Sequence, residues 1–269
     1  MTTLVMGILN VTPDSFADGG RHFTIEDAIR RADEMIAEGV DIIDVGGEST
    51  KPGSDRITEA EEETRVIPII AELAKRDVAI SIDTTRASIA KKAINLGVSY
   101  VNDVSGGLAD PNMYKTIAAH PKVQYIIMHW RTHSKNMQEL ASYRDVVKEV
   151  KEEIEARIES AIEAGVNPEQ IIIDPGLGFS KLAEHNWEIL RNIERLALLG
   201  YPILIGASRK RFLGELTGAT SPDEREAASI AVTAMVAKHE VWGVRTHSVK
   251  PHRDAIATVN SFAKSKVQG

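Results

Sequence analysis

Two hydrophobic patterns alternate along the whole chain: short apolar runs, and longer stretches with the spacing of an amphipathic helix. The short runs are rich in Val and Ile and are bounded by Gly, Pro, Asn or Asp, which is typical of buried strands. Eight such runs occur. The predicted strands are 4–11, 40–45, 78–82, 100–104, 123–128, 170–173, 202–205 and 242–245.

A predicted helix follows each predicted strand. Thr24, Thr58 and Ser221 stand at helix starts, with an acidic residue two or three positions later. Four glycines follow helices and precede strands, where a left-handed C-cap is expected, and they are Gly39, Gly97, Gly165 and Gly200. The predicted helices are 24–38, 59–75, 86–96, 110–119, 142–164, 183–199, 222–239 and 250–265.

The alternation predicts an α/β fold with a parallel sheet covered by helices. Eight strand–helix units in a chain of 269 residues fit a closed (β/α)8 TIM barrel, parallel and eight-stranded, better than an open doubly wound sheet. No G-x-G-x-x-G motif follows the first strand, which also disfavours a dinucleotide-binding fold. We therefore expect one domain over residues 1–269, with its functional site at the carboxyl ends of the strands.

Composition limits the partners and the chemistry. No apolar run is long enough for a membrane helix, and a net charge of −7 provides no basic field for nucleic acid. An anionic ligand would therefore need a local cluster of cations. The chain has no cysteine and begins without the basic segment of a secretory signal, so we expect chemistry based on oxygen and nitrogen groups and a cytoplasmic location.

Polar residues are concentrated at the predicted strand ends. A lone Asp or Asn there can equally cap a helix or fix a loop, and a lone His is more often structural. Together, however, they would be costly to bury without a polar ligand, so the set predicts a binding site. The set consists of Asn10, Asp44, Asp83, Asn102, Asp103, His129, Asp174, the segment 208–210, Arg245 and His247.

The residue types indicate a ligand. Asp83, Asn102 and Asp174 offer acceptors and an amide to a flat, nitrogen-rich ring such as a pterin or a purine-like heterocycle. Lys210 is placed to bond a carbonyl or nitrogen of that ring, and Arg245 to stack on its face.

A phosphate group is predicted beside the ring. Arg245 and His247 follow the eighth strand, in the region where such barrels commonly bind phosphate. Asn10 can supply one oxygen ligand to Mg²⁺, whose coordination is typically completed by waters and substrate phosphates. The residues thus predict a heterocyclic substrate that carries a phosphate ester, with Mg²⁺ as cofactor.

Four motifs in these positions closely resemble those of the dihydropteroate synthase family, over nearly the whole chain. They are Met-Gly-Ile-Leu-Asn-Val-Thr-Pro-Asp-Ser-Phe at 6–16, Asp-Val-Gly-Gly-Glu-Ser-Thr at 44–50, Asp-Pro-Gly-Leu-Gly-Phe at 174–179 and Ser-Arg-Lys at 208–210. The resemblance implies condensation of 6-hydroxymethyl-7,8-dihydropterin diphosphate with 4-aminobenzoate, giving 7,8-dihydropteroate and diphosphate in folate biosynthesis. It also implies a homodimer and a sulfonamide target.

The resemblance assigns roles to individual residues. The pterin would be held by Asp83, Asn102, Asp174 and Lys210, and Asp44 would be a further substrate-binding residue. The diphosphate and its Mg²⁺ would be held by Asn10, Arg245 and His247. 4-Aminobenzoate would lie against Thr50, Pro52, Phe179 and the stem of Lys210, under closing loops at 12–20 and 49–53. The catalytic residues among these would be Asp83, Lys210, Arg245 and His247.

Three positions depart from the family's usual motifs. Lys51 stands where Arg is usual and keeps the charge without the bidentate fork. Ser248 stands where an acid usually follows His247, which predicts that the His247 ring lacks an orienting partner. Arg211 follows Lys210, where Ser is frequent.

Two other functions remain open from the sequence alone. A methyltetrahydrofolate-dependent corrinoid methyltransferase would also surround a pterin with acids and amides, but its chemistry needs no diphosphate site. A catalytically silent relative is suggested by Lys51 and Ser248 alone. A homodimer surface is another open point, since Ile230, Val232, Ala234 and Val236 are predicted first as core.

Overall fold

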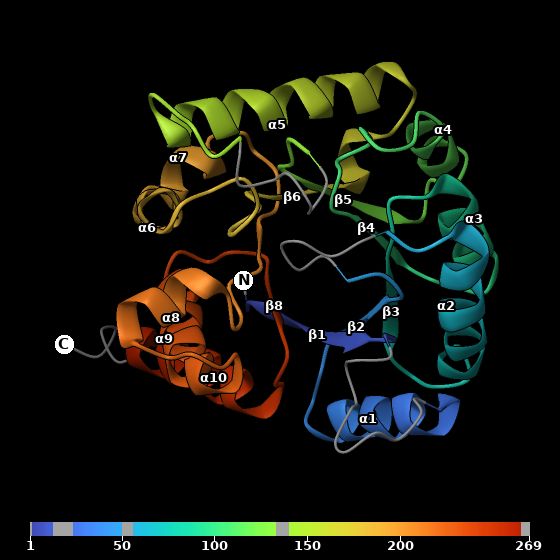
Figure 1. The fold of residues 1–269 in the computed structure, drawn as a ribbon, viewed down its shortest axis with the longest axis horizontal. Coiled ribbons are helices and arrows are strands. Elements are labelled where there is room, and N and C mark those ends of the chain that lie inside the picture. Colours follow the sequence, from blue (N-terminus) through green and yellow to red (C-terminus); the bar gives the residue numbers. More distant parts are fainter. Residues whose placement is uncertain (1, 13–23, 50–55, 133–139, 265–269) are drawn as a thin grey trace.

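The protein folds as a (β/α)8 barrel, in which eight parallel strands form one sheet surrounded by helices (Figure 1). A computed structural model describes residues 2–12, 24–49, 56–132 and 140–264. All eight predicted strands are present. They are β1 (Leu4–Asn10), β2 (Ile42–Gly46), β3 (Ala79–Asp83), β4 (Tyr100–Asp103), β5 (Gln124–Met128), β6 (Ile171–Asp174), β7 (Leu204–Ile205) and β8 (Gly243–Thr246).

Helices cover the outside of the barrel. They are α1 (Ile25–Ala37), α2 (Glu59–Leu73), α3 (Ala87–Asn95), α4 (Met113–Ala118), α5 (Val146–Glu163), α6 (Ala183–Arg191), α7 (Ile193–Ala197), α8 (Arg211–Thr217), α9 (Glu226–Ala237) and α10 (Lys250–Lys264). Short 3-10 turns at Pro168–Gln170 and Asp223–Arg225 precede β6 and α9. Within the described ranges, no helix has both the length and the apolar character that a membrane span requires.

The predicted helix ends are largely correct. Thr24 and Thr58 accept hydrogen bonds from the backbone N–H groups of Asp27 and Glu61. All four predicted C-cap glycines have a positive φ. The predicted helix 183–199 is wrong in one respect, because it is broken at Asn192, whose side chain donates to the Glu188 carbonyl at 2.9 Å and competes with the helical hydrogen bonds.

The barrel has a seam between β6 and β7. The sheet runs continuously from β6 through β5, β4, β3, β2, β1 and β8 to β7. It closes through an isolated bridge between Ile173 and Ile203, where the Ile173 N–H donates to the Pro202 carbonyl at 2.9 Å. Strand β7 is shorter than the predicted 202–205, since Pro202 has no N–H to contribute to a ladder.

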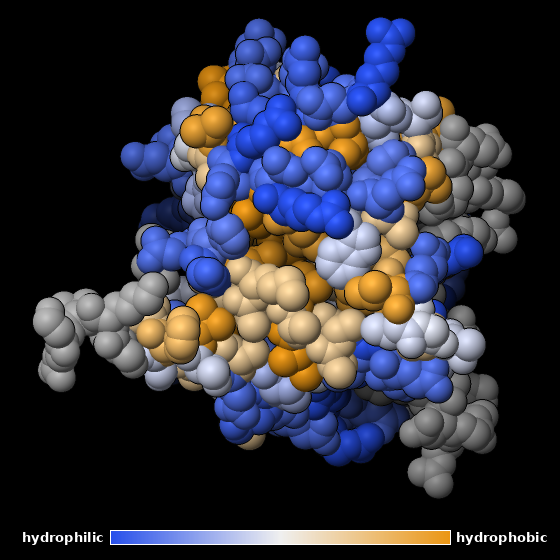
Figure 2. All heavy atoms as spheres, turned by 90° about the vertical axis from the view of Figure 1, so that its left-hand side faces the viewer, coloured by the Kyte–Doolittle hydropathy of each residue, from blue (hydrophilic) through white to orange (hydrophobic). Residues whose placement is uncertain are grey.

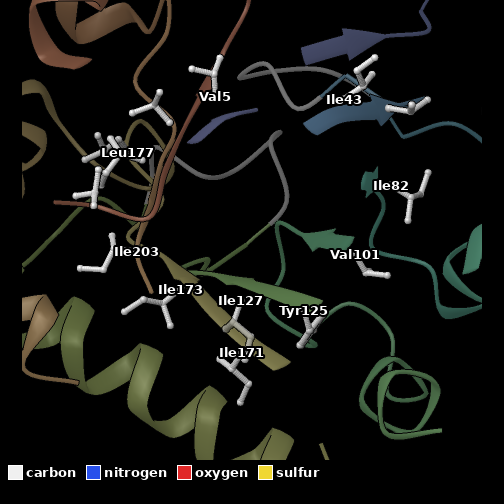
Figure 3. Close-up of a cluster of buried hydrophobic side chains, with 14 of the residues drawn as sticks. Val5, Ile43, Ile82, Val101, Tyr125, Ile127, Ile171, Ile173, Leu177 and Ile203 are labelled. Atoms are coloured by element: carbon white, nitrogen blue, oxygen red, sulfur yellow. The ribbon is translucent and has the colours of Figure 1, made fainter. Parts of the chain in front are cut away.

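The strands are buried on both faces. Side chains that point outward pack against the helices, and Figure 3 shows several of them, including Ile82, Val101 and Ile127. Side chains that point inward form a second cluster of Met6, Ile42, Ile126, Ile172 and Leu204.

Polar residues begin at the next inward position along several strands. Since successive side chains alternate between faces, Asp44 lies two residues beyond Ile42, and Asp174 lies two beyond Ile172. The interior of the barrel is therefore apolar toward the amino-terminal ends of the strands and polar at their carboxyl ends, where the site lies.

Candidate active site

Asn10, Gly46, Asp83 and Asn102 form one row across four neighbouring strands. The register pairs Asn10 with Gly46, Gly46 with Asp83, and Asp83 with Asn102. Paired residues of parallel strands share a face, so these side chains share the mouth of the barrel. A Cβ on Gly46 would lie 3.6 Å from Asp83 Oδ2 and 3.7 Å from Asn10 Oδ1. A methyl group at Gly46 would therefore fill the space between these two oxygen acceptors.

Arg245 of β8 joins two carboxylates at this mouth. Its Nε donates to Asp44 Oδ2 at 2.6 Å, and its Nη2 donates to Asp83 Oδ2 at 2.7 Å. Asn102 Nδ2 donates to the same Asp44 oxygen at 3.0 Å. Side chains predicted from four separate strands therefore form one charge-assisted network. Asp44 Oδ1 is buried and has no hydrogen-bond partner among the described residues.

Burial changes the acidity of this network. It raises the pKa of Asp83 above its usual value, while Arg245 opposes the rise and the Asp44 carboxylate adds to it. Burial also acts to lower the pKa of Arg245, but the carboxylates of Asp44 and Asp83 outweigh it and raise that pKa. A ligand that donates N–H groups or gains positive charge would stabilise the ionised form of Asp83.

Asp174 and Lys210 complete the polar part of the mouth from β6 and from the loop after β7. Asp174 Oδ1 accepts from the Gly176 N–H at 2.7 Å, and Lys210 Nζ donates to the Leu177 carbonyl at 2.6 Å. Burial lowers the pKa of Lys210 to about 8, and Arg245 adds to this effect while the Asp174 carboxylate opposes it. Burial raises the pKa of Asp174, which the Gly176 N–H and Lys210 partly offset.

An apolar wall adjoins Lys210. Phe179 packs with Val104 and Met128, and Trp130 lies against this cluster. Lys210 Nζ lies 4.3 Å from the centroid of the Phe179 ring, a cation–π distance. The site thus combines polar groups suited to a nitrogen-rich ring with a surface suited to an aromatic ligand.

His247 is oriented by Ser208. The Ser208 hydroxyl accepts from the His247 backbone N–H at 3.2 Å and lies 3.0 Å from Nδ1 of the ring. Burial lowers the pKa of His247 to about 3, with Arg209 and Arg245 adding to the effect, so the ring is neutral at neutral pH. A Ser208 hydroxyl that donates to Nδ1 places the ring proton on Nε2. The prediction that His247 lacks an orienting partner is therefore wrong.

Comparison with known proteins is decisive for the family. Residues 6–247 match the family model described as pterin binding enzyme. The dihydropteroate synthase of Mycobacterium leprae is 46% identical over 264 residues, which cover 96% of this chain and 93% of that protein. The chain belongs to the dihydropteroate synthase family.

Solved members of the dihydropteroate synthase family share the fold. The Yersinia pestis enzyme, solved with a sulfonamide drug, superposes with a TM-score of 0.92 at 34% identity and covers 98% of this chain and 95% of its own. The Xanthomonas albilineans enzyme, solved with 4-aminobenzoic acid, has a TM-score of 0.91 at 38% identity and covers 97% of this chain and 93% of its own. The (β/α)8 barrel predicted from the sequence is confirmed, and this chain is a transferase of folate synthesis.

The acid missing from one motif of the dihydropteroate synthase family has a replacement from another element. Ser248 Oγ donates to Glu226 Oε1, on α9. Glu226 also accepts from Arg209 Nε at 2.9 Å and lies 3.3 Å from His252 Nε2. These contacts, with His252 contributing most, lower the pKa of Glu226 to about 2. A carboxylate thus stands beside this motif although residue 248 is not acidic.

Some predicted residues are not part of the geometry described above. Thr50, Lys51 and Pro52 are outside the described residues, as is most of each predicted closing loop. Arg211 is exposed and pairs with Glu215 at 3.2 Å.

Asp103 and His129 belong to structural networks. Asp103 points away from the mouth and accepts from Ser105 and from the Tyr125 hydroxyl, the latter at 2.8 Å. His129 is buried between Glu153 and Lys181. No motif predicted Lys181, which follows the 174–179 segment and is almost fully buried.

Proposed function

We propose that this enzyme condenses 6-hydroxymethyl-7,8-dihydropterin diphosphate with 4-aminobenzoate, giving 7,8-dihydropteroate and diphosphate in the cytoplasm. The methylene carbon loses its bond to the diphosphate oxygen and gains one to the amine nitrogen, which releases a proton. The observation that carries the proposal is the network of Asp44, Asp83, Asn102 and Arg245 at the barrel mouth.

The pterin ring is proposed to lie on this network. Its amino and ring N–H groups are donors, and the carboxylates of Asp83 and Asp174 are acceptors on β3 and β6. Asn102 donates through its amide nitrogen to Asp44, which leaves the amide oxygen as a ligand acceptor. Lys210 then supplies a donor for the carbonyl side of the ring.

The diphosphate is proposed to bind near His247 and Arg245. The neutral His247 ring offers its Nε2 proton, and Arg245 supplies the positive charge. Both groups bond better to oxygens that gain charge as the leaving group departs, which favours the transition state over the ground state.

Asn10 fits a Mg²⁺ ion that is held jointly with the substrate. Among the described residues, no group of three or more acidic or histidine side chains could hold a metal without further ligands. Mg²⁺ typically keeps several waters and binds through one or two protein oxygens together with substrate phosphates, which matches a lone amide oxygen beside Gly46. When bound, it would neutralise charge on the diphosphate.

4-Aminobenzoate is proposed to bind against Phe179 and the stem of Lys210. The two side chains already pack together, and Val104 and Met128 extend the apolar surface. The Xanthomonas enzyme binds the same compound, and the Yersinia enzyme binds a sulfonamide, which supports sulfonamide sensitivity here. Thr50, outside the described residues, is proposed to border this position.

Asp83 is proposed to stabilise positive charge that develops on the pterin and its methylene carbon. The Asp83 carboxylate is buried at the mouth of the barrel. The proposed reaction needs no protein nucleophile, so the carboxylate would act through its charge. Asp83→Asn should therefore lower kcat by about tenfold or more while the pterin still binds, since a charge-assisted interaction is lost. Unchanged turnover with intact pterin binding would refute this role.

The proposed reaction is tested by incubating the enzyme with both substrates, with and without Mg²⁺. Formation of dihydropteroate and equimolar diphosphate that depends on Mg²⁺ is the expected result. Methyl transfer to a corrinoid with no diphosphate requirement would favour the rival methyltransferase. No product at saturating substrate concentrations would indicate a catalytically silent relative.

A homodimer is proposed through the face of α8, α9 and α10. Figure 2 shows apolar side chains over this part of the surface. Leu216, Met235 and Phe262 are 67%, 60% and 74% exposed. Along α9, Val232 and Val236 are buried as predicted, but Ala227, Ala231 and Met235 form an exposed apolar stripe.

Sedimentation equilibrium tests the dimer. The wild-type chain should sediment as two copies, and Met235→Glu should shift it toward one copy because it buries an unpaired charge. A wild-type monomer at micromolar concentration would contradict the proposal.

A further inference from the structure

Lys181 is buried at the end of the loop that follows β6. Its side chain is only 3% exposed, and burial lowers the pKa of its amine well below the usual value, while the Asp174 carboxylate opposes this effect. Nζ donates to the carbonyls of Gly176 and Phe179, both at 3.0 Å, and to His129 Nδ1 at 2.8 Å. These three neighbours match the three N–H donors of an ammonium.

His129 contacts Lys181 and is itself bonded to Glu153 of α5. Burial, together with the nearby Lys181, lowers the pKa of His129 to about 4, so its ring is neutral at neutral pH. A neutral ring that accepts at Nδ1 carries its proton on Nε2, which lies 3.0 Å from Glu153 Oε2. Glu153 also accepts from Arg131 Nε at 3.1 Å. A continuous chain of polar contacts thus runs from the surface of α5 to Lys181.

The loop that Lys181 holds contains one backbone turn, in which the Phe179 N–H donates to the Gly176 carbonyl at 3.0 Å. Gly176, Gly178 and Ser180 have φ values of 65°, 78° and 48°, and a left-handed serine is uncommon. A Cβ on Gly176 would lie 2.3 Å from the His129 carbonyl. This tight path needs external support, and the Lys181 ammonium supplies it from inside the bend.

The same loop carries two groups of the candidate site. Phe179 forms part of the apolar wall, and the Leu177 carbonyl accepts from Lys210 at 2.6 Å. Lys181 bonds the carbonyl of Phe179 itself and that of Gly176, the residue before Leu177. A shift of Lys181 would therefore move the Phe179 ring and the acceptor of Lys210 together.

We propose that Lys181 is a positioning residue for the 4-aminobenzoate end of the site, with His129 and Glu153 fixing its place. This inference rests on the proposed function, since it concerns that second substrate. Burying an ammonium is costly, and an apolar side chain of similar size would fill the same volume at no such cost. The contacts that the ammonium makes all lead to the loop of Phe179 or to its own support.

The test compares Lys181→Met with Gln170→Met. Gln170 is a matched control because it is equally buried, and its Nε2 donates to the carbonyls of His120 at 3.1 Å and Val123 at 2.7 Å, on the other end of the barrel. Both variants should lower the melting temperature. Only Lys181→Met should raise the KM for 4-aminobenzoate, by about tenfold or more, while the KM for the pterin diphosphate changes less than about threefold.

Other outcomes are equally decisive. Unchanged KM values in a folded Lys181→Met enzyme would show that Lys181 only stabilises the fold. A wild-type enzyme that forms no dihydropteroate would refute the proposed function and this inference with it, whereas an active wild-type enzyme beside a Lys181→Met enzyme with unchanged KM values would refute the inference alone. If Lys181→Met does not fold, Glu153→Gln replaces it, because Glu153 is a partly exposed residue at the outer end of the chain. An increase of about twofold or more in the KM for 4-aminobenzoate supports the proposal, and no increase overturns it.

Discussion

The guanidinium of Arg245 donates a 2.7 Å hydrogen bond to the carboxylate of Asp83 across the mouth of the barrel. Its second bond, to the fully buried Asp44, makes it the cation shared by two buried acids. Arg245→Met should lower the free energy of unfolding by about 3 kcal/mol or more at pH 7, since it leaves buried carboxylates without their counter-charge. Urea unfolding measures the change.

The pH dependence and a surface variant serve as controls for Arg245→Met. Burial raises the pKa of Asp83 in the folded state above its unfolded value, so the folded variant binds protons more tightly than the unfolded chain. The loss of unfolding free energy in Arg245→Met should therefore become smaller as the pH falls from 7 to 5. Arg76→Met breaks a partly exposed pair with Asp33 and should cost less than about 1 kcal/mol. Equal losses in both variants would contradict the role of burial.

The contact between Ser208 and His247 predicts a fixed tautomer. Nitrogen-15 NMR of histidine-labelled enzyme should show a neutral His247 ring with its proton on Nε2 down to about pH 5, because burial depresses its pKa. Ser208→Ala should free the ring and lower kcat by about tenfold, the value of one hydrogen bond to a reacting group. A His247 ring that protonates above pH 6 in the free enzyme would argue against this arrangement.

The lowered pKa of Lys210 predicts the alkaline limit of activity. Lys210 loses its proton near pH 8, so kcat/KM for the pterin diphosphate, which reports the free enzyme, should fall above that pH. In Lys210→Arg the guanidinium stays charged, and the fall should move beyond pH 10 even if overall activity is lower. A fall near pH 8 that persists in Lys210→Arg would assign the limit to another group or to the substrate.

Gly178 and Gly200 separate backbone strain from crowding of the site. Both have a φ of 78°, but a Cβ on Gly178 would lie 2.9 Å from Lys210 Cδ, whereas one on Gly200 would meet nothing within 4 Å. Gly200→Ala should cost about 1 kcal/mol of stability and leave both KM values unchanged. Gly178→Ala should show the same cost and also raise the KM for the pterin by about tenfold. Identical kinetics in the two variants would exclude crowding.

Periodicity was sufficient to predict the strands, because burial on both faces produces uninterrupted apolar runs that end at polar residues. The rim positions followed from the same rule: Asp83 and Asp174 are the last residues of their strands, Asn102 is the last but one, and all three lie at the mouth of the barrel. Helix α8 was not predicted, and Gly214 in its middle is unfavourable in a helix. That glycine is required by packing, as a Cβ would lie 2.6 Å from the Ala219 carbonyl.

Contacts between distant elements could not be predicted from local pattern. Ser208 bonds to a residue 39 positions away, and Glu226 replaces an acid whose usual position is 248, on another element. Lys181 follows an apolar segment in a loop, where an exposed lysine is the ordinary expectation. Each of these side chains acquires its role only when the barrel brings separate loops together.

The seam between β6 and β7 connects ligand binding to the integrity of the barrel. Asp174 ends β6, and Lys210 follows β7, so a ring bonded to both spans the place where the sheet is joined by the Ile173–Ile203 bridge. The proposed pterin would then link these two strands in addition to the Ile173–Ile203 bridge. The Ile173 amide, bonded to Pro202, should exchange with deuterium more slowly when the site is filled, although it does not touch the ligand.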